Sequence, residues 1–152
     1  MRPGLRARVR PGRLVPRRRR PQPARDAEPA TDWPGLREAL WERCKGLCES
    51  CGYRLAGPDR FDAHHRQARG QGGRDVLPCL VALHGPCHTV QPYSVHMRPE
   101  WARARGLIVR RGADPARVAL LLPDGRLVLL DDAGGYVTVM EREGVAGGGE
   151  LR

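Results

Sequence analysis

The chain has 152 residues and a formal net charge of +10, with 19 glycines, 14 prolines and only 5% aromatic residues. This length fits one domain with appendages, and so few aromatic side chains predict a thin apolar core that needs a staple such as a metal ion. No apolar run follows the charged N-terminus, so we expect neither a secretory signal peptide nor contact with a membrane. The five cysteines are expected to be metal ligands in a reducing cytoplasm rather than a disulfide framework.

Charge is distributed unevenly along the chain. Residues 1–25 contain ten arginines and no acidic residue, and we predict that residues 1–30, rich in arginine and proline, form a disordered tail. This tail is either an arm that binds the DNA backbone or a dispensable extension, and the sequence favours neither. Residues 45–111 carry 11 basic and 5 acidic side chains, whereas residues 112–152 carry 4 and 7. The basic middle segment suits a surface that contacts phosphate.

The order of the predicted elements indicates a small α+β fold. "TDWPGLREALWERCKG" predicts a helix, because its apolar residues fall on one stripe. A cysteine knuckle, a strand near Arg60–His64, a glycine-rich loop and the apolar run "CLVAL" follow, and "RPEWARARG" predicts a short helix. Strands at Val118–Leu122 and Arg126–Leu130 flank a turn, and a third strand follows "AGG". We therefore predict a β-meander appendage with a flexible C-terminus over residues 112–152.

Four residues have the spacing of a structural zinc site. Cys48 and Cys51 are separated by two residues, and so are His84 and Cys87, so each pair can turn both ligands toward one ion. The alternative, buried thiols and a solvated His84, is less favoured because two such pairs occur in a chain with little core. Zinc on these four residues would be structural, with no position open for substrate.

The remaining cysteines, Cys44 and Cys79, are less favoured as metal ligands. Cys44 falls on the apolar stripe of the first predicted helix and is interpreted as a core residue. Cys79 lies five residues before His84, outside the knuckle spacing, and is considered only as a substitute ligand.

A second group of histidines is left over once zinc is assigned. His64 and His65 are adjacent and would point to opposite faces of a strand, and His88 follows the second zinc knuckle directly. Because zinc ties the two knuckles together, His88 can lie near His64 or His65. An imidazole there could accept a proton from water, and a divalent ion could stabilise the charge of a scissile phosphate.

Three arginines flank the sequence "GQGG" and are candidates for phosphate contacts, with a solvated loop as the alternative. They are Arg66, Arg69 and Arg74. Asp62 shares the predicted strand face of His64, so it is either a further ligand or, more simply, an exposed carboxylate.

The motifs "LCESCG", "DAHHRQARGQGG", "CLVALHGPCH" and "VHMRPEWARARGLIV", read in this order, resemble the HNH endonucleases of the His-Me finger (ββα-metal) superfamily. The resemblance is to the zinc-stapled form common in actinobacteria and their phages. It extends from about Trp33 to Arg111, so residues 31–111 are interpreted as an HNH nuclease domain. The family implies DNA as the substrate, Mg²⁺ or Mn²⁺ as the catalytic ion and no small-molecule cofactor. A phage packaging or host DNA-processing partner is conceivable, although no residue specifies one.

The resemblance also implies roles for individual residues. His64 and His88 would bind the catalytic ion, and His65 would be the general base that activates water. The third histidine of the motif would be displaced by a four-residue insertion around Val90–Tyr93 to His96. His96 is then either a third ligand or a phosphate contact, but the simpler interpretation is an exposed loop histidine.

The main departure from the family pattern is Cys79, which stands where the motif has the asparagine that orients the base. A thiol is a weak hydrogen-bonding group beside an amide, so catalysis could be slowed or lost. The favoured hypothesis remains a metal-dependent DNA endonuclease, because His64, His65 and His88 are all present. The alternatives are a catalytically impaired zinc-stapled DNA-binding protein and a small zinc protein whose arginine tail binds RNA or a protein partner.

Overall fold

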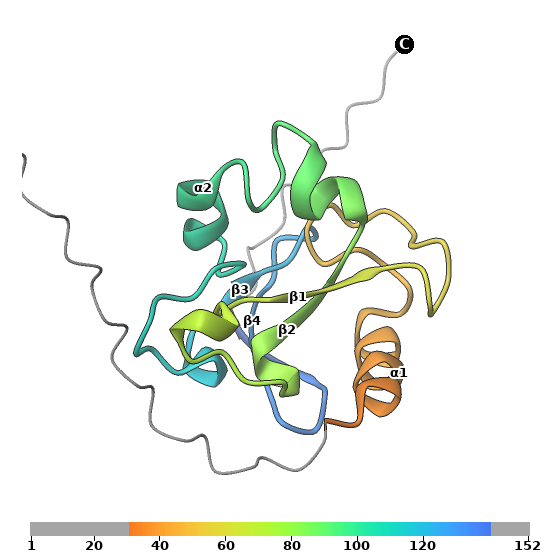
Figure 1. Ribbon diagram of the computed structural model, residues 1–152, viewed down its shortest axis with the longest axis horizontal. Helices are drawn as coiled ribbons and strands as arrows, with labels where there is room; N and C mark the ends of the chain where they lie inside the picture. Colours follow the sequence, from red (N-terminus) through yellow and green to blue (C-terminus); the bar gives the residue numbers. More distant parts are fainter. Residues whose placement is uncertain (1–30, 141–152) are drawn as a thin grey trace, which may run out of the picture. The chain divides into compact units, whose positions relative to one another are not determined.

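The computed structural model describes residues 31–140 (Figure 1), and the predicted tail at residues 1–30 and the last twelve residues lie outside this range. The described residues form a mixed helix and sheet fold, as predicted. No helix among them is long and apolar enough to cross a membrane.

Helix α1 spans Trp33–Cys44 and begins where the sequence predicts. The Asp32 carboxylate accepts a hydrogen bond from Gly35 N at 3.1 Å and so caps the first turn. Lys45 and Gly46 adopt positive φ values of 52° and 71°, which end the helix and turn the chain into the cysteine knuckle at Cys48–Cys51. Leu40 and Cys44 on the predicted apolar stripe are buried.

A two-stranded antiparallel sheet lies beside α1 (Figure 1). It consists of β1 (Asp62–His65) and β2 (Leu80–Leu83), in a register that pairs His64 with Val81 and His65 with Leu80. The loop between the strands contains two short 3-10 helices, η1 (Arg69–Gln71) and η2 (Leu77–Cys79). A single turn of π-helix, η3 (Pro86–Val90), follows β2.

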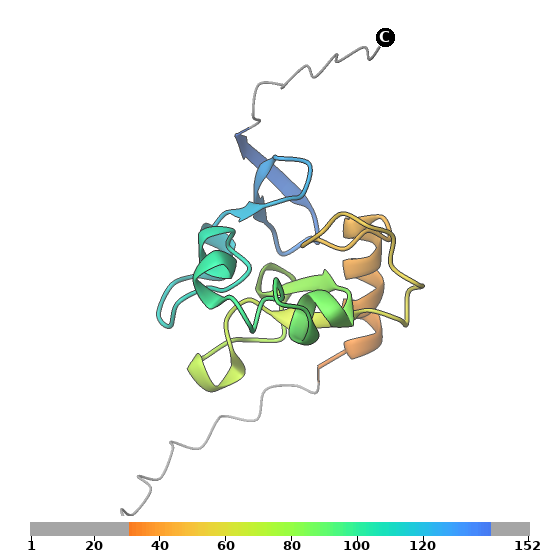
Figure 2. The same ribbon diagram turned by 90° about the horizontal axis from the view of Figure 1, so that it is seen from above.

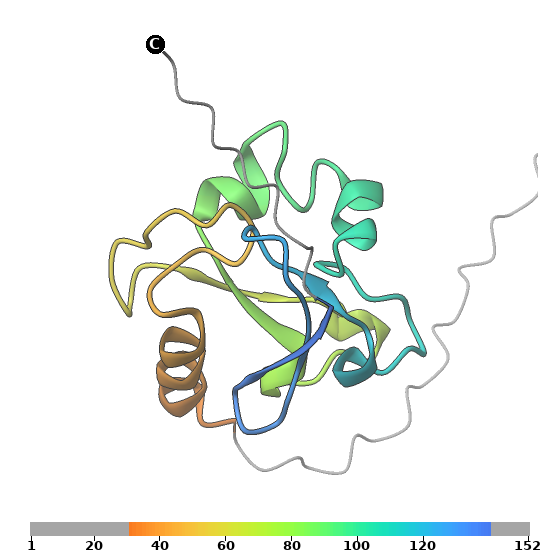
Figure 3. The ribbon, with the colours of Figure 1, turned by 180° about the vertical axis from the view of Figure 1, so that it is seen from behind.

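The rest of the chain forms a short helix and a second sheet. Helix α2 spans Pro99–Ala104, and the 3-10 helix η4 spans Pro115–Arg117. The second sheet is antiparallel with the order β3-β4-β5, made of Leu120–Leu121, Leu127–Leu130 and Tyr136–Met140. It lies behind the β1–β2 sheet in Figure 1 and in front of it in Figure 3, and Figure 2 shows the two sheets and α1 from above.

Both sheets contribute to one hydrophobic core. Leu80 and Leu83 of β2 belong to the same buried cluster as Leu120, Val128 and Leu130 of the second sheet. The predicted boundary between residues 111 and 112 therefore does not separate two cores.

A buried polar network joins α1, the first knuckle and the second sheet. The Arg43 guanidinium donates to both carboxylate oxygens of Glu49, at 3.1 and 2.9 Å, and the Tyr136 hydroxyl donates to Glu49 at 2.7 Å. Glu49 also accepts from the backbone N–H of Ala82 at 2.6 Å. Because Glu49 directly follows Cys48, this network fixes the first knuckle against β2.

Candidate metal centres

The four predicted zinc ligands come together. The ligand atoms of Cys48, Cys51, His84 and Cys87 all lie within 4.8 Å of one another. The distance from His84 Nδ1 to Cys51 Sγ is 3.4 Å and that to Cys87 Sγ is 4.0 Å. Tetrahedral zinc, with bonds of about 2.3 Å to sulfur and about 2.0 Å to nitrogen, places such atoms roughly 3.6 Å apart. This Cys₃His group could therefore hold a metal ion such as zinc.

Local backbone structure aims these ligands at one point. In the first knuckle, Cys48 N donates to Tyr53 O at 2.9 Å and Gly52 N donates to Cys48 O at 2.8 Å, with Gly52 at φ 79°. The second pair lies where β2 ends and η3 begins. His84 Nε2 lies 3.0 Å from Arg54 O, so Nε2–H donates to this carbonyl and leaves Nδ1 for the ion.

Burial disfavours the charged thiolate form of two of these cysteines, Cys48 and Cys87, as long as no cation is bound. Burial and, after it, the neighbouring Cys48 raise the pKa of Cys87 to about 12. Burial also raises the pKa of Cys48. A bound cation favours the thiolate forms and offsets their mutual repulsion.

The other two cysteines lie outside this group. Cys44 is buried in the core, as predicted. Cys79 is buried as well, and its Sγ lies 3.7 Å from the carbonyl oxygen of Gln67. It is neither a substitute metal ligand nor a hydrogen-bond partner of His65 among the described residues.

Three histidines form a second cluster. One nitrogen from each of His64, His88 and His96 lies within 4.8 Å of the others, and the Nε2 atoms of His88 and His96 are 3.0 Å apart. The convergence of His64 and His88 was expected. His96 is exposed in a turn, as its simpler interpretation expects, and its ring nitrogen also belongs to this group. The backbone bond from His96 N to His88 O holds it there at 3.2 Å.

Hydrogen bonds orient two of these rings. His64 Nε2 lies 3.0 Å from Leu107 O, so Nε2–H donates to the carbonyl and the Nδ1 lone pair remains available. His88 Nδ1 lies 2.9 Å from the Asp62 carboxylate, which likewise leaves His88 Nε2 available. Asp62 is therefore a carboxylate that orients a ligand, as is common around metal-bound histidines.

Burial keeps His64 in the form that can bind a metal. The pKa of His64 is lowered to about 4, mainly by burial and also by the neighbouring His88 and His96, against the opposing effect of the hydrogen bond with the Leu107 carbonyl. Burial and His88 also lower the pKa of His96. Neutral imidazoles carry the free lone pair that a cation requires.

His65 makes a different set of contacts. Its Nε2 lies 2.7 Å from Asp75 Oδ1, and its ring packs edge-on against Trp33 at a centroid distance of 6.0 Å. Asp75 is fixed in turn by hydrogen bonds from the Thr31 hydroxyl at 3.0 Å and from Arg69 at 2.9 Å. The 3.4 Å contact from Arg69 Nε to His65 Nε2 is much the longer, so Asp75 sets the tautomer and leaves Nδ1 as the basic nitrogen.

Of the three predicted phosphate contacts, one is wrong. Arg66 is fully buried, and its guanidinium donates to the carbonyl oxygens of Gly106, Pro78, Pro115 and Val118 at 2.6–3.1 Å. Burial lowers its pKa to about 10. A side chain so engaged is not available to a phosphate on the surface. Arg69 and Arg74 are exposed, and Arg69 is paired with Asp75.

No family model, curated protein or solved structure matches this chain. The geometry of the two clusters is therefore what indicates a function. The Cys₃His group has the composition of a filled structural site. The three histidines, with buried His64 at the base and exposed His96 at the edge, can hold a cation while leaving other coordination positions open to solvent.

Proposed function

We propose that this protein is a metal-dependent endonuclease of the HNH, or ββα-metal, type that hydrolyses phosphodiester bonds in DNA. The observation that carries the proposal is the convergence of His64, His88 and His96 on one group. His65, the residue after His64 in β1, is paired with the Asp75 carboxylate. The order of elements supports it, since β1 and β2 are antiparallel and a helical turn that carries His88 follows β2.

Each group has a separate task in this proposal. A divalent ion on the three histidines would supply charge stabilisation for the scissile phosphate and the leaving 3′ oxygen. His65, held through Nε2 by Asp75, accepts the proton of the attacking water at Nδ1. Asp62 keeps His88 Nε2 directed at the cluster. The Cys₃His group keeps the end of β2, and hence His88, in place.

The donor set discriminates between the two predicted ions. Mg²⁺ prefers oxygen ligands, whereas transition metals accept imidazole nitrogen. We therefore expect Mn²⁺ to support catalysis better than Mg²⁺.

A nicking assay tests the proposal. Supercoiled plasmid is incubated with Mn²⁺ and with the wild type, His65→Ala or the control Thr89→Ala, an exposed residue of the same helical turn as His88. Zinc content is measured for all three proteins. The proposal predicts nicking by the wild type and Thr89→Ala, and a loss of at least about a hundredfold in His65→Ala at unchanged zinc content.

The other outcomes count against it. Equal nicking by all three proteins would identify a contaminant. Plasmid binding without nicking by the wild type would leave the alternative from the sequence, a DNA-binding protein with impaired catalysis.

A further inference from the structure

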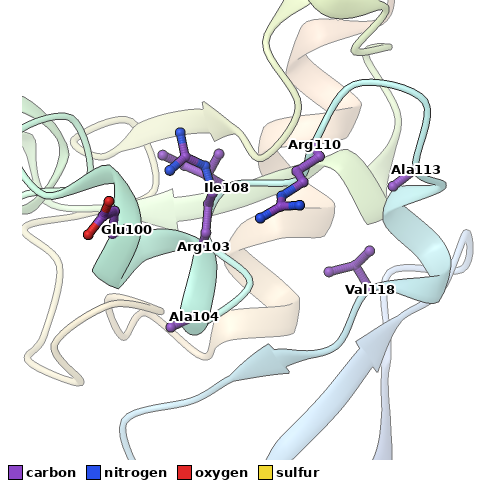
Figure 4. A pocket seen from close by; sticks show the side chains of 7 residues that line it. All are labelled: Glu100, Arg103, Ala104, Ile108, Arg110, Ala113 and Val118. Carbon is purple, nitrogen blue, oxygen red and sulfur yellow. The ribbon is translucent and has the colours of Figure 1, made fainter.

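A shallow groove of about 550 Å³ lies between helix α2 and the segment that follows it. Figure 4 shows Arg103 from α2 and Arg110 from that segment, with Ile108 between them. Both side chains are exposed, and neither guanidinium group has a hydrogen-bond or ion-pair partner within residues 31–140. Glu100, in the first turn of α2, lines the same groove. The groove thus has two unpaired positive charges and one negative charge.

The segments that line the groove are connected to the histidine cluster. Helix α2 begins three residues after His96. On the other side, Leu107 accepts the hydrogen bond of His64, and Val109 N donates to Arg66 O at 2.6 Å. The segment that carries Ile108 and Arg110 is therefore fixed to the end of β1, where His64 and His65 lie.

The residues that line the groove match the alternation of sugar and phosphate in a nucleic-acid backbone. Ile108 and Val118 supply an apolar surface on which a sugar can lie, and the two guanidinium groups can each donate to phosphate oxygens. The arginines predicted from the sequence fit this task less well, because Arg66 is buried and Arg69 is paired with Asp75.

We infer that Arg103 and Arg110 bind backbone phosphates of the DNA strand that enters the histidine cluster. This inference rests on the proposed function for the identity of the ligand. The two arginines would hold the strand in register and would contribute to affinity rather than to the chemical step.

Salt-dependent binding to a short labelled DNA duplex tests it. All proteins carry His65→Ala so that the duplex stays intact. Each neutralised phosphate contributes about 0.9 to the slope of log affinity against log salt concentration. The pair Arg103→Gln and Arg110→Gln should therefore reduce the slope by about 1.8 between about 50 and 200 mM salt.

Arg60→Gln is the matched control, because Arg60 is also an exposed arginine whose guanidinium has no hydrogen-bond or ion-pair partner among the described residues. Arg60 belongs to the loop before β1, and Figure 1 shows this loop on the opposite side from α2. An unchanged slope in the Arg103/Arg110 variant, or an equal change in the control, overturns the inference.

Two further measurements separate the possible failures. Inorganic phosphate should displace the duplex no better than chloride at the same ionic strength; selective displacement would identify a site for small anions instead. Nicking is then measured with His65 restored, where the Arg103/Arg110 variant should raise KM more than it lowers kcat. If the wild type does not nick DNA but the slope falls as expected, the proposed function is wrong and phosphate binding by Arg103 and Arg110 is supported. If the wild type nicks DNA and the slope is unchanged, only the inference about Arg103 and Arg110 is wrong.

Discussion

His65 Nε2 lies 2.7 Å from Asp75 Oδ1, so Asp75 orients the imidazole that the resemblance to the HNH motif expected residue 79 to orient. The Cys79 thiol points instead at the Gln67 carbonyl, at 3.7 Å. Asp75 is well placed to stay ionised: burial raises its pKa, but hydrogen bonds from His65 and Thr31 outweigh this and the net pKa is lowered. The base of the proposed reaction is therefore oriented by a carboxylate rather than by a residue at the asparagine position.

Removing Asp75 should slow the chemical step. We expect Asp75→Ala to reduce kcat for plasmid nicking by about tenfold to a hundredfold with little change in KM, because His65 loses its orientation but DNA contacts remain. Asp75→Asn should lose less, since the amide oxygen can still accept from Nε2–H.

Cys79→Ala is the matched control for this experiment, and it should change kcat by less than about threefold. Zinc content is measured for each variant. Equal losses of kcat in Asp75→Ala and Cys79→Ala would contradict the assignment of Asp75, as would a rise in KM alone.

Local patterns predicted the elements that carry the site. The apolar stripe of α1, the paired two-residue spacings of the zinc ligands and the apolar run of β2 are all read within a few residues. Asp75 carried no such signal, because it reaches His65 only when the loop between β1 and β2 folds back over ten residues. Asp62 was considered as a ligand, but its task as the partner of His88 depends on a contact across 26 residues.

Arg66 shows why a phosphate contact cannot be predicted from charge alone. An arginine beside a glycine-rich loop is normally solvated, and the prediction of a phosphate contact followed from that. Its four carbonyl partners come from residues 78, 106, 115 and 118, which no local pattern brings together. The position of His96 was similarly hard to predict, because the insertion before it was only inferred; the backbone bond from His96 N to His88 O brings the loop back to the cluster.

Arg66 should therefore matter for stability rather than for DNA binding. Arg66→Met leaves several carbonyl oxygens without their donor, and we expect it to lower the free energy of unfolding by about 3 kcal/mol or more. Arg117→Met is the control, because Arg117 forms only an exposed pair with Asp114, and it should change the free energy by less than about 0.5 kcal/mol. Chemical denaturation measures both. A small effect of Arg66→Met, together with weaker DNA binding, would restore the surface assignment.

The Cys₃His group should be required for folding. Structural zinc in small domains contributes roughly 10 kcal/mol or more of apparent binding free energy, so chelation should unfold the protein cooperatively. Cys51→Ser should lose the metal, whereas Cys44→Ala should retain it, because Cys44 lies in the core outside the ligand group. Substitution with Co²⁺ checks this, since thiolate-to-cobalt charge-transfer absorption reports sulfur ligands specifically. Retention of that absorption in Cys51→Ser, or its loss in Cys44→Ala, would be the contrary result.

Buried His64 should make stability depend on pH when no ion occupies the histidine cluster. Its pKa of about 4 in the folded protein lies below the unfolded value of 6.5, so the unfolded chain binds the proton more tightly. The contribution of His64 is complete above pH 6.5, falls as the pH decreases below 6.5 and levels off below about 4. Between pH 7 and pH 5 the wild type should lose about 2 kcal/mol relative to His64→Gln. Denaturant titrations at both pH values, with zinc retained and no other divalent ion added, measure this difference, in which the titration of the remaining groups cancels. Parallel pH dependences of the two proteins would show that burial does not hold His64 neutral.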